Sequence, residues 1–220
     1  MQCLIWLNLG RFDVLFKKSL ILNWRGESSS LLSHAMRCPR CFQTMHLSAE
    51  ECPHCGLTLG LLDSVYAGFS RVVRRPHDTA GVLRVKDRAR VAKWIAKAEK
   101  AFPQLYFSLA TVSLRDDQQI RSYGYWLMNR GVFEERHESS RDDGCVLLVL
   151  DVNRKEVCVC FGYLMDRQMK EAEAFSALAD AHPHLLEGNY VRSIDVMLRG
   201  VKKYVKRLCR RAKREAKKSG

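Results

Sequence analysis

Long hydrophobic stretches are missing from this 220-residue chain. Its first two apolar runs, residues 3–9 and 20–24, are separated by charged residues and are far shorter than the roughly 20 apolar residues that span a bilayer. Nor does a basic start lead into one apolar stretch and a small-residue cleavage site, the pattern of a secretory signal. These absences predict a cytoplasmic protein without a transmembrane segment; a short membrane-surface helix is the alternative for residues 1–35.

A cysteine framework typical of secreted domains is missing too. The nine cysteines are an odd number, and five stand outside the two CxxC pairs: Cys3, Cys145, Cys158, Cys160 and Cys209. Three of the five lie in apolar runs, where a reduced thiol behaves as a small hydrophobe. Free thiols of this kind are typical of a reducing compartment, which agrees with the predicted cytoplasmic location.

Acidic residues are nearly absent from the C-terminal end. Residues 199–220 contain eleven Lys/Arg and one acid, whereas the preceding 198 residues carry 26 basic and 23 acidic residues. The net charge of +13 therefore belongs mostly to one basic tail. Such a tail predicts attraction to nucleic acid or to an anionic membrane surface. The plainer interpretation is a core-packed helix whose other face is solvated.

Two CxxC pairs separated by ten residues form the most specific motif in the chain. They place Cys38, Cys41, Cys52 and Cys55 in one short segment, and Gly56 follows the last cysteine. Each CxxC can form a tight turn that presents two thiolates, and two such turns supply the four soft ligands of a tetrahedral site. We therefore predict one structural Zn²⁺ in a small ribbon, with no open position for catalysis.

The same cysteines allow other interpretations. Two disulfides would require an oxidising compartment that nothing else in the sequence indicates. A redox-active CxxC normally accompanies a thioredoxin-like strand–helix pattern, which this sequence lacks. His46 and His54 are potential replacement ligands, but the set of four cysteines is complete without them. Zinc is the prediction that the spacing favours.

The zinc motif also divides the chain into segments. We predict a poorly ordered extension or over-called start, a zinc ribbon, a linker with scattered Gly, Pro and Arg, a larger domain, and the basic tail. These segments are residues 1–35, 36–60, 61–81, 82–208 and 209–220. Met36 stands directly before the motif and would make a natural initiator in place of Met1.

Hydrophobic periodicity predicts an α/β fold for the larger domain. Helices are expected at residues 82–102, 118–129, 167–181 and 189–214, and strands at residues 105–114, 144–151 and 156–161. The last two strands are close in sequence, which predicts an antiparallel hairpin with Asn153 in its turn. Its first strand is apolar without alternation, so helices should cover both faces of the sheet.

Acidic residues gather around this hairpin. Asp142 and Asp143 precede its first strand, and Asp166 follows its second. A hairpin brings the start of one strand near the end of the next, so these carboxylates can approach one another and suit Ca²⁺ or Mg²⁺. The same polar loop adds Glu134, Glu135 and Glu138. The plainer interpretation is a turn, a helix cap and solvated glutamates, and we identify no nucleophile.

The second half of the chain carries a recognisable string. It reads DDGCVLLVLDVNRKEVCVCFGYLMD, followed by KEAEAF and EGNYVRSI. Residues 85–208 thereby resemble the TPM domain, the family of thylakoid-lumen acid-phosphatase-like and photosystem-repair proteins and their bacterial relatives. The matching positions are Asp143, Gly144, Arg154, Lys155, Gly162, Tyr163, Asp166, Glu171, Gly188 and Tyr190.

This resemblance implies a three-layer α/β/α sandwich behind the zinc ribbon. It also implies an acidic, calcium-type site near the loop before the apolar strand. Acid phosphatase activity is attributed to some members but does not define the family. Two features depart from the family pattern. Leu164 stands where members often have Gly, and this sequence shows neither a secretory signal nor a membrane span, whereas many members are exported or membrane-anchored.

These features together predict a non-catalytic binding or assembly role. The most specific site is closed and structural, and no catalytic set is complete. In this role the ribbon and basic tail recruit partners, first of all another protein, and the TPM-like domain is the scaffold. A metal-dependent acid-phosphatase-like hydrolase using Asp143 and Asp166 is the first alternative. An accessory protein that binds nucleic acid through ribbon and tail is the second.

Overall fold

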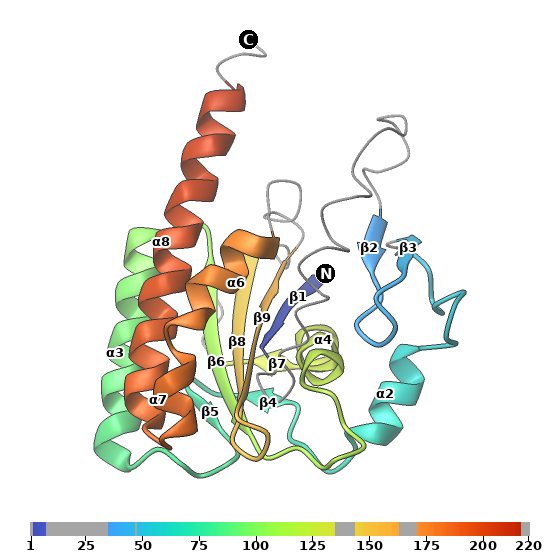
Figure 1. Cartoon of the computed structure of the whole chain (residues 1–220), viewed down its shortest axis with the longest axis horizontal. Helices are drawn as coiled ribbons and strands as arrows, with labels where there is room; N and C mark the ends of the chain where they lie inside the picture. Colours follow the sequence, from blue (N-terminus) through green and yellow to red (C-terminus); the bar gives the residue numbers. More distant parts are fainter. Residues whose placement is uncertain (1, 8–34, 47, 135–143, 163–170, 217–220) are drawn as a thin grey trace.

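The centre of the molecule is a five-stranded sheet (Figure 1). The structure is a computed structural model that describes residues 2–7, 35–46, 48–134, 144–162 and 171–216. In spatial order the strands are β1 (Gln2–Leu7), β9 (Glu156–Phe161), β8 (Cys145–Asp151), β6 (Tyr106–Val112) and β5 (His77–Asp78). β5, β6 and β8 run parallel, whereas β9 pairs antiparallel with β8 and with β1.

Both faces of the central strands are buried. Along β8, Val146 and Leu148 pack into one hydrophobic cluster, whereas Leu147 and Val149 pack into a second cluster on the opposite face. A strand covered on both sides needs apolar residues at every position, which explains the unbroken apolar run. Hydrophobic clusters therefore lie on both faces of this strand.

Different helices and strands cover the two hydrophobic clusters (Figure 1). The first lies under α3 (Val85–Ala101), α6 (Glu171–Ala179), α7 (His182–Leu186) and α8 (Tyr190–Ala216). The second lies under α2 (Leu59–Val65), α4 (Ile120–Arg130) and a small sheet of β2 (Ala35–Arg37) and β3 (Thr44–His46). β4 (Val72–Val73) and β7 (Val132–Phe133) form a further parallel pair. The chain thus mixes helix and sheet, as the α/β prediction requires.

The predicted hairpin is present, and Asn153 lies in its turn, at residues 152–155. β8 and β9 pair antiparallel with Asp151 opposite Glu156. Lys155, not Asn153, has the positive φ of the turn, at 56°. The Asn153 side chain instead donates a hydrogen bond of 2.9 Å to the carbonyl of Leu114 and so ties the hairpin to the end of β6.

Three segments differ from the sequence-based expectation. Residues 61–81, predicted as a linker, contain most of α2 together with β4 and β5, and Tyr66 within them is 1% exposed. Residues 2–7, assigned to an extension, form edge strand β1. Residues 182–186 form α7, between the helices expected at residues 167–181 and 189–214, because proline is tolerated in a first helical turn. The helices and strands in these segments are short, so hydrophobic periodicity gives little signal.

A buried carboxyl group closes the end of β8. Asp151 is fully buried, and one of its oxygens accepts backbone N–H bonds from Leu114 (3.2 Å) and Asn153 (3.1 Å). Its other oxygen has no hydrogen-bond partner among the described residues. Burial raises the pKa of Asp151, although the two N–H donors partly oppose that effect.

We expect Asp151→Asn to change how stability depends on pH. A carboxyl whose pKa is raised in the folded state stabilises below its unfolded pKa and loses that contribution as pH rises through its folded pKa. The amide of asparagine keeps an accepting oxygen but carries no charge. The stability of the Asp151→Asn protein relative to wild type should therefore increase from pH about 4.5 to pH about 8. Urea unfolding at both pH values measures this. An identical pH dependence in the two proteins would contradict the account.

Candidate metal centre

Both CxxC segments fold into the same kind of turn. In the first, the N–H of Phe42 donates to the carbonyl of Cys38 (3.0 Å), and the N–H of Cys38 donates to the carbonyl of Gln43 (2.9 Å). In the second, the N–H of Gly56 donates to the carbonyl of Cys52 (2.9 Å), and the N–H of Cys52 donates to the carbonyl of Leu57 (2.9 Å). The two turns therefore present their cysteine pairs in equivalent ways, as a zinc ribbon requires.

The turns bring the four sulfur atoms of Cys38, Cys41, Cys52 and Cys55 together. All four lie within 4.8 Å of one another, with 3.7 Å between Cys38 and Cys55 and 3.7 Å between Cys41 and Cys52. A tetrahedral ion with metal–sulfur bonds of about 2.3 Å requires sulfur–sulfur separations of about 3.8 Å. A disulfide requires about 2.0 Å. The cluster therefore has dimensions that could hold one four-coordinate metal ion, and its cysteines are free of disulfides.

Backbone groups help to ionise one of these thiols. Burial acts to raise the pKa of Cys52, but hydrogen bonds from the N–H groups of His54 and Cys55 and from the Cys38 and Cys41 side chains together lower the pKa to about 6. Burial raises the pKa of Cys38 to about 12 and also raises the pKa of Cys55. A bound cation favours the thiolate form of every ligand, so metal affinity should weaken as acid protonates the cluster.

Neither candidate histidine joins the cluster. His46 is exposed and its ring nitrogen Nδ1 lies 2.7 Å from the hydroxyl of Ser48. His54 is also exposed. Within the described ranges, the four cysteines form the one group of potential metal ligands. The complete sulfur set is thus the arrangement that the structure supports.

The metal cluster belongs to a hydrophobic core that reaches the central sheet. Cys38 and Cys52 are each 1% exposed and share the second cluster with Tyr66 and Trp126. α2 begins at the end of the ribbon, where the Thr58 hydroxyl accepts the N–H of Leu61 (3.0 Å). The ribbon is therefore packed against the larger domain and is not suspended from a free linker.

Two hydrogen bonds fix α2 against α4. The hydroxyl of Tyr66 donates to the carbonyl of Gln119 (2.9 Å), and the indole N–H of Trp126 donates to Asp63 (2.9 Å). Asp63 also forms ion pairs of 3.1 Å with Arg71 and Arg130. Because both hydrogen bonds place buried polar groups on defined partners, they specify how the ribbon side of the molecule sits on α4.

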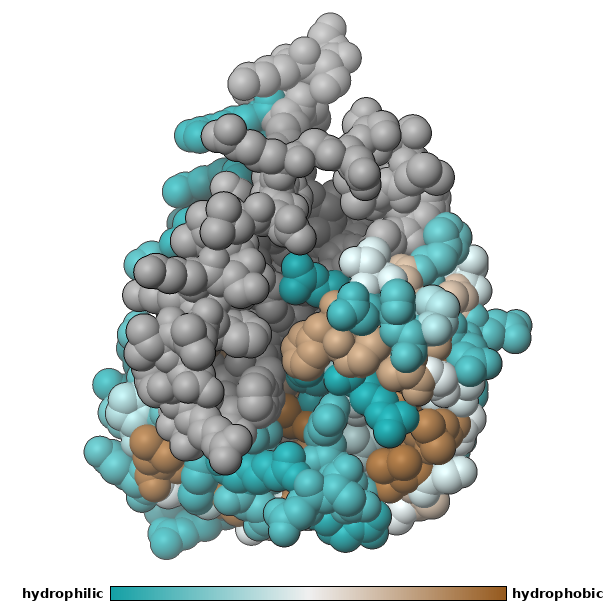
Figure 2. Space-filling view, turned by 45° about the vertical axis from the view of Figure 1, so that its right-hand side comes forward, coloured by the Kyte–Doolittle hydropathy of each residue, from teal (hydrophilic) through white to brown (hydrophobic). Residues whose placement is uncertain are grey.

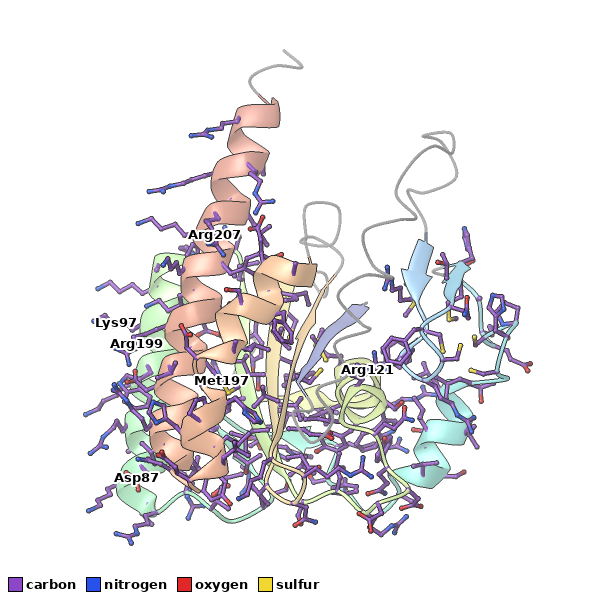
Figure 3. All side chains as sticks on the ribbon, in the orientation of Figure 1. Asp87, Lys97, Arg121, Met197, Arg199 and Arg207 are labelled. Atoms are coloured by element: carbon purple, nitrogen blue, oxygen red, sulfur yellow. The ribbon has the colours of Figure 1, made fainter. Side chains whose placement is uncertain are left out.

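An arginine of α4 also contacts the ribbon itself. The guanidinium of Arg121 lies 3.2 Å from the ring centroid of Phe42, and Figure 3 shows Arg121 between α4 and the ribbon. Phe42 has φ of 68°, as Gly56 does at the equivalent place in the second turn. A bulky residue rarely adopts this left-handed conformation, so Phe42 is held there by the contact that its ring makes.

We expect the two substitutions Phe42→Ala and Phe42→Gly to differ in a defined order. Both lose the contact with Arg121, but alanine retains the unfavourable positive φ and glycine does not. The free energy of unfolding of Phe42→Ala should therefore be about 1 kcal/mol lower than that of Phe42→Gly, and it should also be lower than that of wild type. Chemical denaturation of the zinc-loaded proteins measures the order. An alanine variant at least as stable as the glycine variant would contradict it.

Hydrophobic side chains remain exposed on the ribbon side. Figure 2 shows them interspersed with hydrophilic residues on the part of the surface that faces the viewer. Phe42 is 43% exposed and Leu61 is 41% exposed. Single exposed apolar residues of this kind are ordinary on a protein surface, so this face by itself does not indicate a binding site.

The predicted acidic site cannot be compared with the structure. Asp142, Asp143 and Asp166 lie outside the described residues, as do Glu135 and Glu138. Glu134 is described: its carboxylate lies 3.7 Å from Arg74 and its carbonyl accepts the hydroxyl of Tyr106 (3.0 Å). The Ca²⁺ or Mg²⁺ site therefore stays a prediction.

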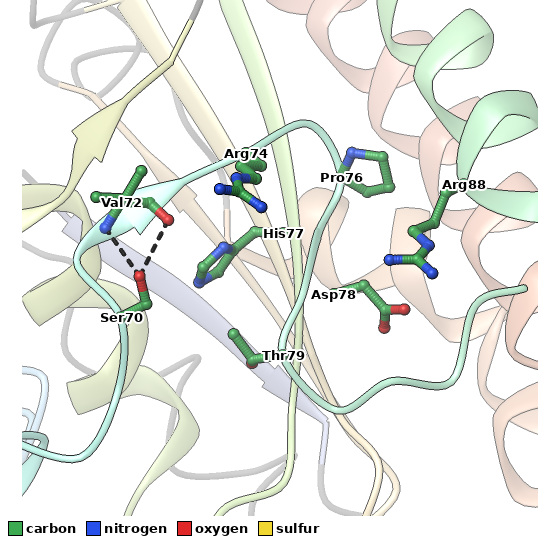
Figure 4. A pocket seen from close by; sticks show the side chains of 8 residues that line it. All are labelled: Ser70, Val72, Arg74, Pro76, His77, Asp78, Thr79 and Arg88. Atoms are coloured by element: carbon green, nitrogen blue, oxygen red, sulfur yellow. Dashed lines mark hydrogen bonds between the residues drawn. The ribbon is translucent and has the colours of Figure 1, made fainter. Parts of the chain in front are cut away.

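A pocket of about 300 Å³ lies beside β4 and β5 (Figure 4). Its walls include Arg74, His77, Asp78 and Arg88. The carboxylate of Asp78 already accepts the N–H groups of Val82 and Leu83, at 3.1 and 3.0 Å, and thereby fixes the chain before α3. Burial, followed by the charge of Arg74, lowers the pKa of His77, which favours its neutral form. The carboxylate of Asp78 is thus already engaged in hydrogen bonds that stabilise the fold.

Sequence reasoning found the cysteines but missed Phe42 and Arg121. The signal for Phe42 is its position: it follows its CxxC pair by one residue, as Gly56 follows the other. Glycine adopts a positive φ without strain, whereas phenylalanine does not. A phenylalanine where the equivalent turn has glycine therefore indicates a side chain whose contacts offset that strain. No signal identifies Arg121, because the contact joins residues far apart in the sequence.

Comparisons with known proteins give little further guidance. No helix in the described part of the chain has the length and apolarity to cross a membrane. No family model matches the chain, and no curated protein matches it. Among solved structures, it is similar to the solution NMR structure of the N-terminal domain of a protein from P. gingivalis, with 18% identity and a TM-score of 0.46. That similarity covers 61% of this chain and 83% of the other, and it assigns neither family nor activity.

Proposed function

We propose that this chain is a non-catalytic binding or assembly protein with one structural Zn²⁺ held by Cys38, Cys41, Cys52 and Cys55. The observation that carries the proposal is the closed set of four sulfurs, which lie within 4.8 Å of one another and continue into the hydrophobic core. Four thiolates fill a tetrahedral zinc site, so no position remains for a water molecule or substrate. Such a metal contributes folding free energy.

The proposed architecture is a ribbon at residues 36–60 and a TPM-like three-layer α/β/α sandwich at residues 82–208. Helices packed on both faces of a sheet support the layers. The short elements of residues 61–81 join the two parts through side-chain contacts, as Tyr66 and Asp63 illustrate. A scaffold whose metal site is internal leaves its outer surfaces for partners.

Phosphate release tests the non-catalytic part of this proposal. Zinc-loaded full-length protein is incubated with p-nitrophenyl phosphate and a panel of phosphomonoesters, with Ca²⁺, with Mg²⁺ or with no added metal. We expect no turnover above that of Asp143→Asn. Metal-dependent phosphate release that disappears in a folded Asp143→Asn protein would overturn the proposal in favour of a hydrolase.

A further inference from the structure

A stripe of positive charge runs along the outer side of α3. Its members are all exposed and recur at alternating spacings of four and three residues: Lys86, Arg90, Lys93, Lys97 and Lys100. Residues at these spacings lie on one face of a helix. α3 belongs to the part of the chain whose overall charge is nearly balanced, so composition alone conceals this stripe.

α8 carries a second stripe of the same kind. Its exposed members are Arg199, Lys203, Lys206, Arg210 and Arg214. The opposite face of α8 contributes Val201, Tyr204, Val205 and Leu208 to the first hydrophobic cluster. The basic tail is therefore the outward face of a core-packed helix as far as the structure describes it.

The two stripes lie on neighbouring helices. α3 and α8 pack side by side on one face of the sheet (Figure 1). The lining of a groove of about 290 Å³ between them includes two arginines and two aspartates, Arg90, Arg192, Asp87 and Asp195. Figure 3 places Lys97 and Arg199 at the same level on the outside of the pair, with Arg207 further along α8. Together the two stripes form one surface, which we name the α3–α8 basic face.

The acids near this face are already occupied. Asp87 of α3 pairs with Arg90 at 3.7 Å. Asp195 pairs with Arg192 and Arg199 at 3.3 and 2.8 Å. Glu99 turns inward, where it pairs with Arg75 and accepts the N–H of Phe107.

Glu173 of α6 pairs with Arg207 and Arg211. Several cations remain that form no ion pair with another described residue: Lys93, Lys97, Lys100, Lys203, Lys206, Arg210 and Arg214. A cluster of unneutralised cations on one face attracts a polyanion.

Resting on the proposed binding role, we propose that the α3–α8 basic face binds the phosphate backbone of a nucleic acid. The alternative occupant is an anionic membrane surface, which an amphipathic helix binds by inserting its apolar side. The apolar side of α8 is packed on the sheet: Val201, Tyr204 and Val205 are each at most 1% exposed. Because the apolar side of α8 is buried in the protein, the helix can bind a partner only through its charged side, and contacts with phosphates require only charge.

The proposed surface excludes the ribbon. α3 and α8 pack on the first hydrophobic cluster, whereas Cys38 and Cys52 belong to the second, on the other face of the sheet. The ribbon strands β2 and β3 therefore lie away from α3 and α8 (Figure 1). Binding through lysines and arginines on a helix surface should be largely independent of sequence and strongly dependent on salt.

The test compares two variants of the full-length protein with equal net charge. One neutralises the proposed face by Lys97→Gln, Lys100→Gln, Lys203→Gln and Lys206→Gln. The matched control neutralises four exposed arginines elsewhere by Arg37→Gln, Arg40→Gln, Arg74→Gln and Arg115→Gln. Fluorescence anisotropy with labelled single-stranded DNA, duplex DNA and RNA is measured between about 50 and about 200 mM salt.

We expect wild type and the control variant to bind at least one of these probes with similar affinity. The face variant should bind at least about tenfold more weakly at about 50 mM salt, and its slope of log K against log salt should be smaller in magnitude by about 3 to 4. Equal losses in both variants would overturn the proposal, as would no binding by wild type or tighter binding to phosphatidylserine vesicles than to every nucleic acid probe. Zinc content and phosphate release of the same preparations are measured separately, so failure here is distinguishable from failure of the proposed function.

Discussion

Cys55→Ser should destabilise the whole protein and not the ribbon alone. Cys55 supplies one of the four sulfurs, and its neighbours Cys38 and Cys52 lie in the same hydrophobic cluster as Tyr66 and Trp126. Loss of the metal therefore loosens a core that continues under the central sheet. Because a tightly bound ligand stabilises the folded state in proportion to the logarithm of its affinity, we expect a loss of at least about 4 kcal/mol in unfolding free energy.

Thermal unfolding followed by circular dichroism measures this loss, with Cys209→Ser as the matched control. Both cysteines are half-buried, but Cys209 lies on α8, outside the metal cluster. A zinc chelator should lower the unfolding temperature of wild type and of Cys209→Ser and leave Cys55→Ser nearly unchanged. A separate low-temperature transition, with the main transition unmoved, would show that the ribbon unfolds independently and would contradict the shared core.

Gly200→Ala should also be strongly destabilising, although the change usually favours a helix. A Cβ at residue 200 would lie 2.0 Å from the backbone carbonyl oxygen of Ala177, where α8 packs against α6. Backbone atoms cannot rotate away as a side chain can, so the two helices must separate. We expect a loss of about 2 to 3 kcal/mol in unfolding free energy, at the upper end of the range for an overpacked core.

Gly60→Ala provides the control for this substitution. Gly60 lies in α2, and a Cβ there would meet nothing closer than the Thr58 hydroxyl at 3.8 Å. The helix propensity of alanine should make this variant as stable as wild type or more stable, by up to about 1 kcal/mol. Urea unfolding distinguishes the two sites. A neutral Gly200→Ala would mean that α6 and α8 do not approach as closely as described.

The sequence predicted the features that depend on local pattern. Two CxxC pairs identified the four cysteines that the structure brings together. The apolar run of β8 and its neighbour predicted a hairpin, which is present with Asp151 opposite Glu156. Such features are predictable because a single segment of chain contains the whole signal.

Features that depend on distant residues were not predicted. Residues 61–81 contain too few periodic positions to reveal α2, β4 and β5. α2 is fixed by partners such as Trp126, whereas β4 pairs with β7 and β5 pairs with β6. The contact of Phe42 with Arg121 joins the ribbon to α4 across 79 positions of sequence. The lysine stripe of α3 was hidden because its charge is balanced by acids elsewhere in the chain. Proximity in space, not composition, creates each of these features.

X-ray absorption at the zinc edge of purified full-length protein tests the central claim most directly. One zinc per chain with four sulfur neighbours at about 2.3 Å is the predicted result, because the sulfurs of Cys38, Cys41, Cys52 and Cys55 have the spacing of that tetrahedron. Nitrogen or oxygen neighbours in place of sulfur, or a protein that folds with no metal, would contradict the account.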